Sequence, residues 1–276
     1  MTLRPGLDHE GCFLREGSLS RVPAAFAPVV EAVRARITAA FGPPGGPRLH
    51  SAYLYGSIPR GTAIPGVSDL DLLLAFRQEP SEDDRSAVRA LNAEVDAAFP
   101  QIDGVGTLAY GVDTLLSELE RNDLGWFVSR LCTPLLGDDL SDRLPRYRPT
   151  SLLARETNGD LAEFLPRWRA RATAPDATEA DLLALSRGAS RKTVRTGFTL
   201  VMPRWNGWTS DLSRSAEVFA QYYPARAAQM HAAARTARTP SPDRAALATL
   251  TDDLGPWLAT EYTTLHGTKT PRPYPT

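Results

Sequence analysis

The sequence predicts an α/β (α+β) protein in which an N-terminal domain with a small mixed sheet flanked by helices is followed by an all-helical C-terminal domain. Residues 48–55 and 69–76 are apolar stretches of strand length, and the segment between them is rich in glycine and proline. Apolar residues recur at helical spacing over residues 23–41. From about residue 114 the apolar period is helical and stays helical, with interruptions at proline and glycine. We therefore expect a sheet-containing domain over residues 1–145.

The remaining elements of this first domain follow from local signals. The helix of residues 23–41 must end in the Gly- and Pro-rich run of residues 42–47, because proline cannot continue a helix. A second helix is predicted over residues 81–98, since an acidic first turn complements the helix macrodipole. A third strand is predicted over residues 102–112.

The helical domain is expected to cover residues 146–268. Neither a repeat of fixed period nor a low-complexity tract is visible in it. The end of the chain, residues 269–276, is rich in proline and has no apolar period, and we expect a flexible tail there.

Composition limits the partners and the location of the protein. The 276 residues carry a formal net charge of −1, which argues against nucleic acid as a partner because nucleic-acid-binding surfaces are strongly basic. The two cysteines, Cys12 and Cys132, lie far apart and have no partner at zinc-ligand spacing, so neither a disulfide framework nor a structural zinc is expected. No apolar run has the length of a signal peptide or of a membrane span. We expect a cytoplasmic protein with no membrane partner.

The segment of residues 53–74 carries the chemistry. A strand that ends at Tyr55 leads Gly56 and Ser57 to the start of a helix, where backbone N–H groups without helical partners bind phosphate. Glycine at this point permits close approach of the ligand. Arg60 follows in the same motif, and its position predicts a contact with the phosphates.

Asp69 and Asp71 lie two positions apart on the second predicted strand. Because side chains alternate along a strand, both carboxylates project from one face while the neighbouring leucines point into the core. Mg²⁺ prefers one or two protein carboxylates, with substrate phosphates completing its coordination. Two such ions a few ångströms apart activate an attacking oxygen and neutralise a leaving pyrophosphate. The pair therefore predicts phosphoryl-group transfer with Mg²⁺, held as two ions.

The order of strand, Gly-Ser and Asp-x-Asp resembles the DNA polymerase beta-like nucleotidyltransferase superfamily, especially its bacterial branch that includes the aminoglycoside nucleotidyltransferases. The resemblance covers about residues 45–140. It implies that Gly56 and Ser57 bind phosphate and that Ser68 is the serine that commonly precedes the metal-binding carboxylates. It also implies that Asp69 and Asp71 are metal ligands. No GxxxxGK[ST] motif competes for the phosphates.

The resemblance further implies a third carboxylate on a neighbouring strand, either as a metal ligand or as the base for the acceptor hydroxyl. Asp103 opens the predicted third strand and Asp113 ends it. We favour Asp103, because Asp113 with the two residues after it is typical of a helix cap. The predicted catalytic and metal-binding set is thus Asp69, Asp71 and Asp103.

A stripe of basic residues lies in the helical domain. Arg187, Arg191 and Arg195 recur every fourth residue, on one helix face, and Lys192 adjoins them. The stripe suits a triphosphate clamp and is equally typical of a solvated helix face. We expect Arg191 and Lys192 to be the nucleotide contacts.

Together these expectations describe a metal-dependent nucleotidyltransferase. It would transfer a nucleoside monophosphate, AMP from ATP, to a hydroxyl of a small-molecule acceptor such as an aminoglycoside-like antibiotic, and release pyrophosphate. The preference for adenine is implied by the resemblance alone. Two alternatives stay open: transfer onto a macromolecule, either tRNA or protein, and a non-catalytic nucleotide-binding protein on the same fold.

Overall fold

The computed structural model describes residues 5–43 and 45–273, which form two compact units. Leu14–Tyr147 make up one unit. The other combines the chain from Arg148 onward with the N-terminal segment that ends at Phe13. The first unit contains the sheet and the second is built of helices, which confirms the predicted fold class.

The sheet has four strands in the order β3-β2-β1-β4. β1 (Leu49–Tyr55) pairs antiparallel with β2 (Leu70–Phe76) and with β4 (Thr133–Gly137), whereas β2 pairs parallel with β3 (Val105–Gly111). The sheet is therefore mixed, as predicted. β4 lies where the sequence predicted only helices, and that part of the prediction is wrong. Its five residues include Pro134, and so short a strand shows no readable alternation.

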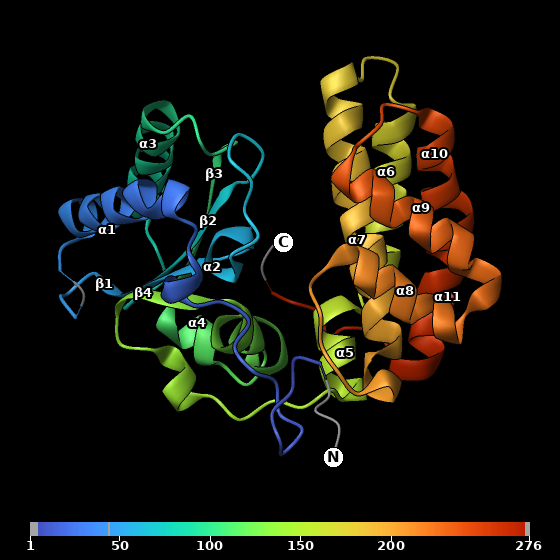
Figure 1. The fold of residues 1–276 in the computed structure, drawn as a ribbon, viewed down its shortest axis with the longest axis horizontal. Helices are drawn as coiled ribbons and strands as arrows, with labels where there is room; N and C mark the ends of the chain where they lie inside the picture. Colours follow the sequence, from blue (N-terminus) through green and yellow to red (C-terminus); the bar gives the residue numbers. More distant parts are fainter. Residues whose placement is uncertain (1–4, 44, 274–276) are drawn as a thin grey trace. The chain divides into compact units, whose positions relative to one another are not determined.

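Helices cover both faces of the sheet, as Figure 1 shows. α1 (Ala27–Phe41) and α3 (Glu82–Ala98) pack on one face and form a core with alternate residues of β1 and β2. On the other face lie α4 (Val112–Leu116) and the two helical turns Arg121–Gly125 and Phe127–Leu131. The alternating side chains of β2 therefore serve two cores, one on each face.

α3 begins at a capping box. The Ser81 hydroxyl accepts a hydrogen bond from the Asp84 N–H at 3.1 Å, and the Asp84 carboxylate accepts one from the Ser81 N–H at 3.0 Å. Such a box satisfies two N–H groups near the helix start that have no helical partner. The start of the crossover helix between β2 and β3 is thereby defined by its own sequence.

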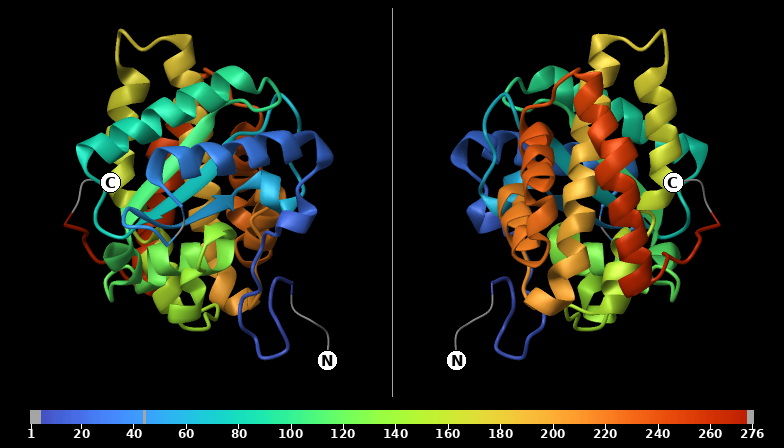
Figure 2. Two further views of the ribbon diagram at one scale, coloured as in Figure 1. Left: turned by 90° about the vertical axis from the view of Figure 1, so that its left-hand side faces the viewer. Right: turned by 90° about the vertical axis from the view of Figure 1, so that its right-hand side faces the viewer.

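The second unit is an array of helices around α7 (Glu179–Trp205). The others are α5 (Ser151–Asn158), α6 (Leu161–Thr173), α8 (Leu212–Tyr222), α9 (Ala227–Arg238), α10 (Arg244–Ala248) and α11 (Gly255–His266). α7 contacts α5, α6, α8, α9 and α11, and the right-hand view of Figure 2 shows this array in yellow to red. None of the described helices is long and apolar enough to cross a membrane.

The N-terminal segment packs into this helical unit. Leu7 and Phe13 form an isolated β-bridge, and both side chains are buried. The Phe13 ring meets Trp208 edge-on, with 5.6 Å between the ring centroids. Trp208 meets Phe198 of α7 at 5.5 Å. Trp208, which follows α7, therefore packs against buried aromatic residues of the helical unit.

The chain end makes at least one buried contact. Arg272, within the predicted tail of residues 269–276, pairs with Glu156 of α5 at 3.2 Å, and both side chains are buried. Residues 274–276 lie outside the described residues. The flexibility of the tail and the predicted domain limits, 1–145 and 146–268, stay predictions.

Candidate active site

The Gly-Ser pair forms the turn from β1 into the short helix α2 (Ser57–Arg60). Gly56 has φ 81° and ψ −152°, a backbone conformation that residues other than glycine rarely adopt. A Cβ atom at this position would lie 2.2 Å from Oδ2 of Asp71. The backbone at Gly56 therefore lies directly against a carboxylate of β2, and no side chain fits between them.

The two aspartates of the motif lie at the beginning of β2. Asp71 pairs with Tyr55 of β1, on the sheet face opposite the one that buries the neighbouring leucines. Asp69 comes one residue before the strand, and the alternation directs it toward the same face. Both side chains are half-buried. Tyr55, the strand partner of Asp71, packs edge-on against Phe127 with 4.9 Å between the ring centroids, and the sequence predicted no site role for it.

Ser68 shapes the loop between α2 and β2. Its hydroxyl accepts a hydrogen bond from the Ile64 N–H at 2.9 Å, and its own N–H donates to the Ile64 carbonyl at 3.0 Å. At the other end of the loop the Thr62 N–H donates to the Ser57 carbonyl at 3.0 Å. These bonds hold the loop that connects the Gly-Ser turn to the aspartates, and a nucleotide contact by Ser68 stays a prediction.

Arg60 ends α2, and its guanidinium lies 3.8 Å from the carboxylate of Glu16. The segment that contains Glu16 is attached to α2, because the Ser18 N–H donates to the Pro59 carbonyl at 2.9 Å. Glu16 could not be predicted as a partner from the motif, because Glu16 lies in a distant part of the sequence. A phosphate contact by Arg60 stays a prediction.

The residue of β3 that pairs with Asp71 is Gly106. Asp103 lies two residues before β3 and is exposed, and Asp113 lies in the first turn of α4 and is also exposed. Among the described residues no group of three or more His, Cys, Asp or Glu side chains could hold a metal ion. The structure therefore does not gather Asp69, Asp71 and Asp103 into such a group. The choice between Asp103 and Asp113 as third carboxylate stays a prediction.

Cys132 directly precedes β4 and is fully buried. Burial raises the pKa of its thiol well above the ordinary value; Arg15 lowers it, and the carboxylates of Asp139 and Asp71 raise it further. A thiol of this kind stays protonated at neutral pH and is a poor nucleophile. We therefore assign Cys132 no role as a nucleophile.

Arg191 and Lys192 lie in the middle of α7, in the helical unit. The Lys192 ammonium lies 2.5 Å from Oδ1 of Asp160 and 3.2 Å from Oδ1 of Asn158. Burial raises the pKa of Asp160, but Lys192 and then Lys269 lower it more, to below the ordinary value. The partner of Lys192 thus comes from the start of α6, where helical spacing could not reveal it. Nucleotide binding by Arg191 and Lys192 stays a prediction.

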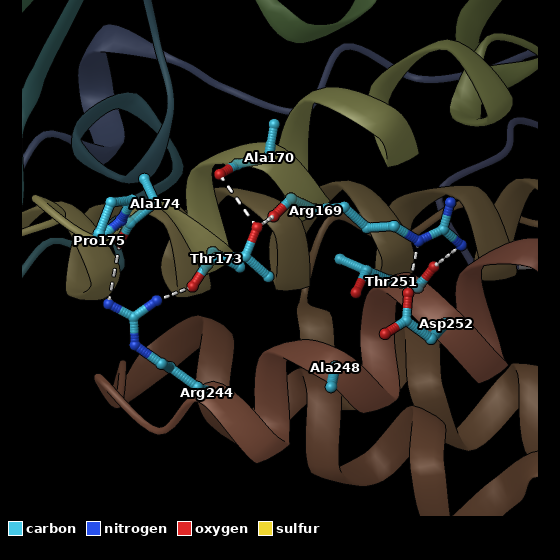
Figure 3. A pocket seen from close by; sticks show the side chains of 10 residues that line it. Arg169, Ala170, Thr173, Ala174, Pro175, Arg244, Ala248, Thr251 and Asp252 are labelled. Atoms are coloured by element: carbon cyan, nitrogen blue, oxygen red, sulfur yellow. Dashed lines mark hydrogen bonds and ion pairs between the residues drawn. The ribbon is translucent and has the colours of Figure 1, made fainter.

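A hollow of about 550 Å³ lies in the helical unit, between α6 and the chain around α10. Figure 3 shows its two arginines turned toward neighbouring oxygens. Arg244 donates to the carbonyls of Ala172 and Ala174, and Arg169 binds the Asp252 carboxylate and the Thr251 carbonyl. Both guanidinium groups are thus engaged by the protein itself, and we assign this hollow no ligand.

The elements that form the motif coincide with a known protein family. The segment of residues 46–123, which includes β1, α2, β2, α3, β3 and α4, matches the family model described as a nucleotidyltransferase domain. This segment is similar to nucleotidyltransferase domains. No curated protein matches the chain. Within the matched segment lie the Gly-Ser turn, the loop held by Ser68, and both aspartates, Asp69 just before β2 and Asp71 in it.

Nucleotidyltransferase domains of this kind generally use divalent metal ions. The residues at the start of β2 fit such an ion, because two half-buried carboxylates supply the hard oxygen ligands that Mg²⁺ prefers. The close approach of Gly56 to Asp71 places backbone, with no intervening side chain, next to these ligands. Asp69 and Asp71 would therefore hold an ion whose remaining ligands come from a triphosphate.

Proposed function

We propose that this protein transfers AMP from ATP to a hydroxyl of a small-molecule acceptor, such as an aminoglycoside-like antibiotic, and releases pyrophosphate. The observation that carries the proposal is the contact between the Gly56 backbone and the Asp71 carboxylate, within a nucleotidyltransferase domain. This contact brings the turn that is proposed to bind phosphate next to the proposed metal ligands. It supports a single site built from two halves of the motif.

Each residue of the site has a role in the proposal. The backbone at Gly56 and Ser57 would bind the phosphate tail, with Arg60 beside it, and Asp69 and Asp71 would hold Mg²⁺. When bound, Mg²⁺ offsets the negative charge of the triphosphate and of the two aspartates. Arg191 and Lys192 are proposed as further phosphate contacts, although Lys192 must then share its charge with Asp160.

The transfer itself balances as a displacement at phosphorus. The acceptor oxygen forms a bond to the α-phosphorus while the bond from that phosphorus to the bridging oxygen of the β-phosphate breaks. Pyrophosphate leaves, and the hydroxyl proton passes to solvent. The protein contributes orientation and electrostatic stabilisation, which are the principal effects in phosphoryl-type transfers.

The choice of a small acceptor is supported by charge. With a net charge of −1 the chain lacks the overall basic character that attracts tRNA. Adenine and the aminoglycoside-like acceptor are implied by the resemblance to the antibiotic-modifying branch. Transfer onto tRNA or protein, and nucleotide binding without transfer, are the competing outcomes of the test.

The test combines nucleotide binding with label transfer. Pure protein, Mg²⁺ and each α-³²P-labelled nucleoside triphosphate are incubated with aminoglycosides, with tRNA, or alone. Label on an aminoglycoside supports the proposal. Label on tRNA or on the polypeptide would replace it with a macromolecular acceptor, and tight nucleotide binding with label on none of the three would favour a binding protein.

Asp69→Asn and Asp71→Asn connect this activity to the site. Each should abolish transfer and the Mg²⁺-dependent thermal stabilisation by ATP, which is about 2.7 kcal/mol for wild type at a hundredfold excess over Kd. Asp83→Asn, at an exposed position of α3, is the matched control and should behave as wild type. Full transfer by Asp69→Asn would show that the catalytic assignment is wrong.

A further inference from the structure

The β3 side of the aspartate pair is lined by glycine. The parallel register pairs Asp71 with Gly106, and the Leu70 N–H donates to the carbonyl of Gly104 at 2.9 Å. Gly104 therefore lies next to Asp69, one position before the paired residues Leu70 and Val105. The strand that neighbours both proposed metal ligands therefore presents backbone to them where a side chain would otherwise stand.

The backbone does not require glycine at position 106. Gly106 lies in regular β-strand and is exposed, and its φ is outside the left-handed region. A Cβ atom on Gly106 would lie 3.5 Å from Oδ1 of Asp71, an ordinary van der Waals distance, with no other described atom within 4 Å. Position 106 thus has room for a side chain next to Asp71, in contrast to Gly56, where a Cβ would collide with the same carboxylate.

A carboxylate at position 106 would be correctly placed to bind a metal ion together with Asp71. In a parallel pair, residues in register point to the same face, so its side chain would stand beside that of Asp71. Asp103 does not fill this place, because it lies before the strand and forms no metal-binding group with Asp69 and Asp71. Further along the same face, β3 presents Leu108 and Tyr110, which are partly buried and pack against the apolar core.

Charge decides how many cations such a site can hold. Two divalent cations a few ångströms apart repel each other strongly, and closely spaced carboxylates are what offsets that repulsion. Two aspartates and a triphosphate suffice for one shared ion. A second ion on the acceptor side has no phosphate tail to share and depends on a third protein carboxylate.

We propose that this chain holds a single divalent cation, through Asp69 and Asp71, and that Gly106 occupies the position from which a carboxylate would create a second cation site. The inference rests on the proposed function. It replaces the two ions predicted from the aspartate pair and the third carboxylate that the resemblance implied. The acceptor then approaches Asp71 past the exposed backbone of Gly106.

The experiment counts Mn²⁺ by electron paramagnetic resonance in the presence of α,β-methylene-ATP, which binds but is not cleaved. Wild-type protein should bind one Mn²⁺ per chain and give the signal of an isolated ion. Gly106→Asp should bind two ions per chain with an exchange-coupled signal, and its second ion should bind at least about tenfold more tightly than to wild type. Gly106→Ala is the matched control, because it adds the Cβ without the carboxylate, and it should match wild type.

The outcomes separate the two proposals. A coupled ion pair in wild type would overturn the single-cation inference, and so would a single isolated ion in a folded Gly106→Asp protein. Thermal melting establishes that each variant folds. If Gly106→Asp does not fold, the number of Mn²⁺ ions bound by wild-type protein decides the inference by itself. Wild-type protein that binds neither Mn²⁺ nor the nucleotide analogue would instead overturn the proposed function, on which this inference depends.

Discussion

Gly56 and Asp71 show how closely single residues are matched at this site. The glycine adopts φ 81°, and the space that a side chain would fill is occupied by Oδ2 of Asp71. Any larger residue would meet two separate penalties, one from the backbone conformation and one from displacement of the carboxylate. The proposed metal and phosphate binding would depend on the second penalty, because a displaced carboxylate no longer faces the turn.

Gly56→Ala is predicted to abolish Mg²⁺-dependent nucleotide binding and to lower the free energy of unfolding by about 1–3 kcal/mol, since alanine is strained in this conformation. Gly42→Ala separates the two penalties. Gly42 has φ 86° and ψ 175°, and a Cβ there would meet nothing within 4 Å. The Gly42→Ala protein should lose a similar amount of stability, yet calorimetry should show normal nucleotide binding. Wild-type affinity in folded Gly56→Ala would contradict this account of the turn.

At the scale of elements, charged side chains tie α7 to distant segments of its own unit. Asp160, at the start of α6, is buried and pairs with Lys192 of α7 at 2.5 Å and with Lys269 near the chain end at 3.5 Å. Lys192 also lies 5.1 Å from the ring centre of Phe164. A buried carboxylate between two ammonium groups is stable only while it is ionised, so this junction depends on pH.

Asp160→Asn is predicted to lower the free energy of unfolding at pH 7 by about 3 kcal/mol, because it removes the carboxylate that pairs with two partly buried ammonium groups. The folded-state pKa of Asp160 lies below its ordinary value of 3.8. Its stabilisation is therefore complete above that value and is lost as the pH falls through the folded-state pKa. Urea unfolding should show a difference between variant and wild type that shrinks as the pH falls below about 4.

Asp176→Asn is the control for this junction, since Asp176 is exposed in the turn between α6 and α7. It should change stability by less than about 0.5 kcal/mol at any pH. A difference between Asp160→Asn and wild type that stays constant from pH 7 to pH 3 would contradict the ionic origin of the stabilisation.

At the scale of the whole molecule, the boundary between the units does not follow the order of the sequence. The first described residues belong to the helical unit, and the chain crosses to the sheet unit after Phe13 and returns after Tyr147. Phe13 is 1% exposed, whereas its neighbour Leu14 is 51% exposed. Two adjacent apolar residues therefore contribute very differently to stability.

Phe13→Ala is predicted to destabilise the helical unit by about 3–5 kcal/mol, because it opens a cavity against Trp208. Leu14→Ala should cost less than about 0.5 kcal/mol. Denaturant unfolding followed by tryptophan fluorescence measures the effect, since four of the five tryptophans lie in that unit. Equal stability of the two variants would show that the N-terminal segment does not belong to the core of the helical unit.

Much of this protein was predictable because the signals are local. The alternation in residues 69–76 placed Asp69 and Asp71 on one face and Leu70, Leu72 and Leu74 on the other, and the Gly-Ser pair marked a turn. A strand period or a turn residue acts over a few neighbouring positions, so it can be read without knowledge of the rest of the chain. The fold class followed from the same signals.

Other features depended on pairings between residues far apart in the chain, and these only the tertiary structure decided. The register of β3 against β2 set Gly106, and not Asp103, beside Asp71. Packing likewise gave Lys192 its partner Asp160. Such contacts form where packing buries the most apolar surface and satisfies the most polar groups. This depends on the whole chain, so it cannot be predicted from the periodicity of a short segment.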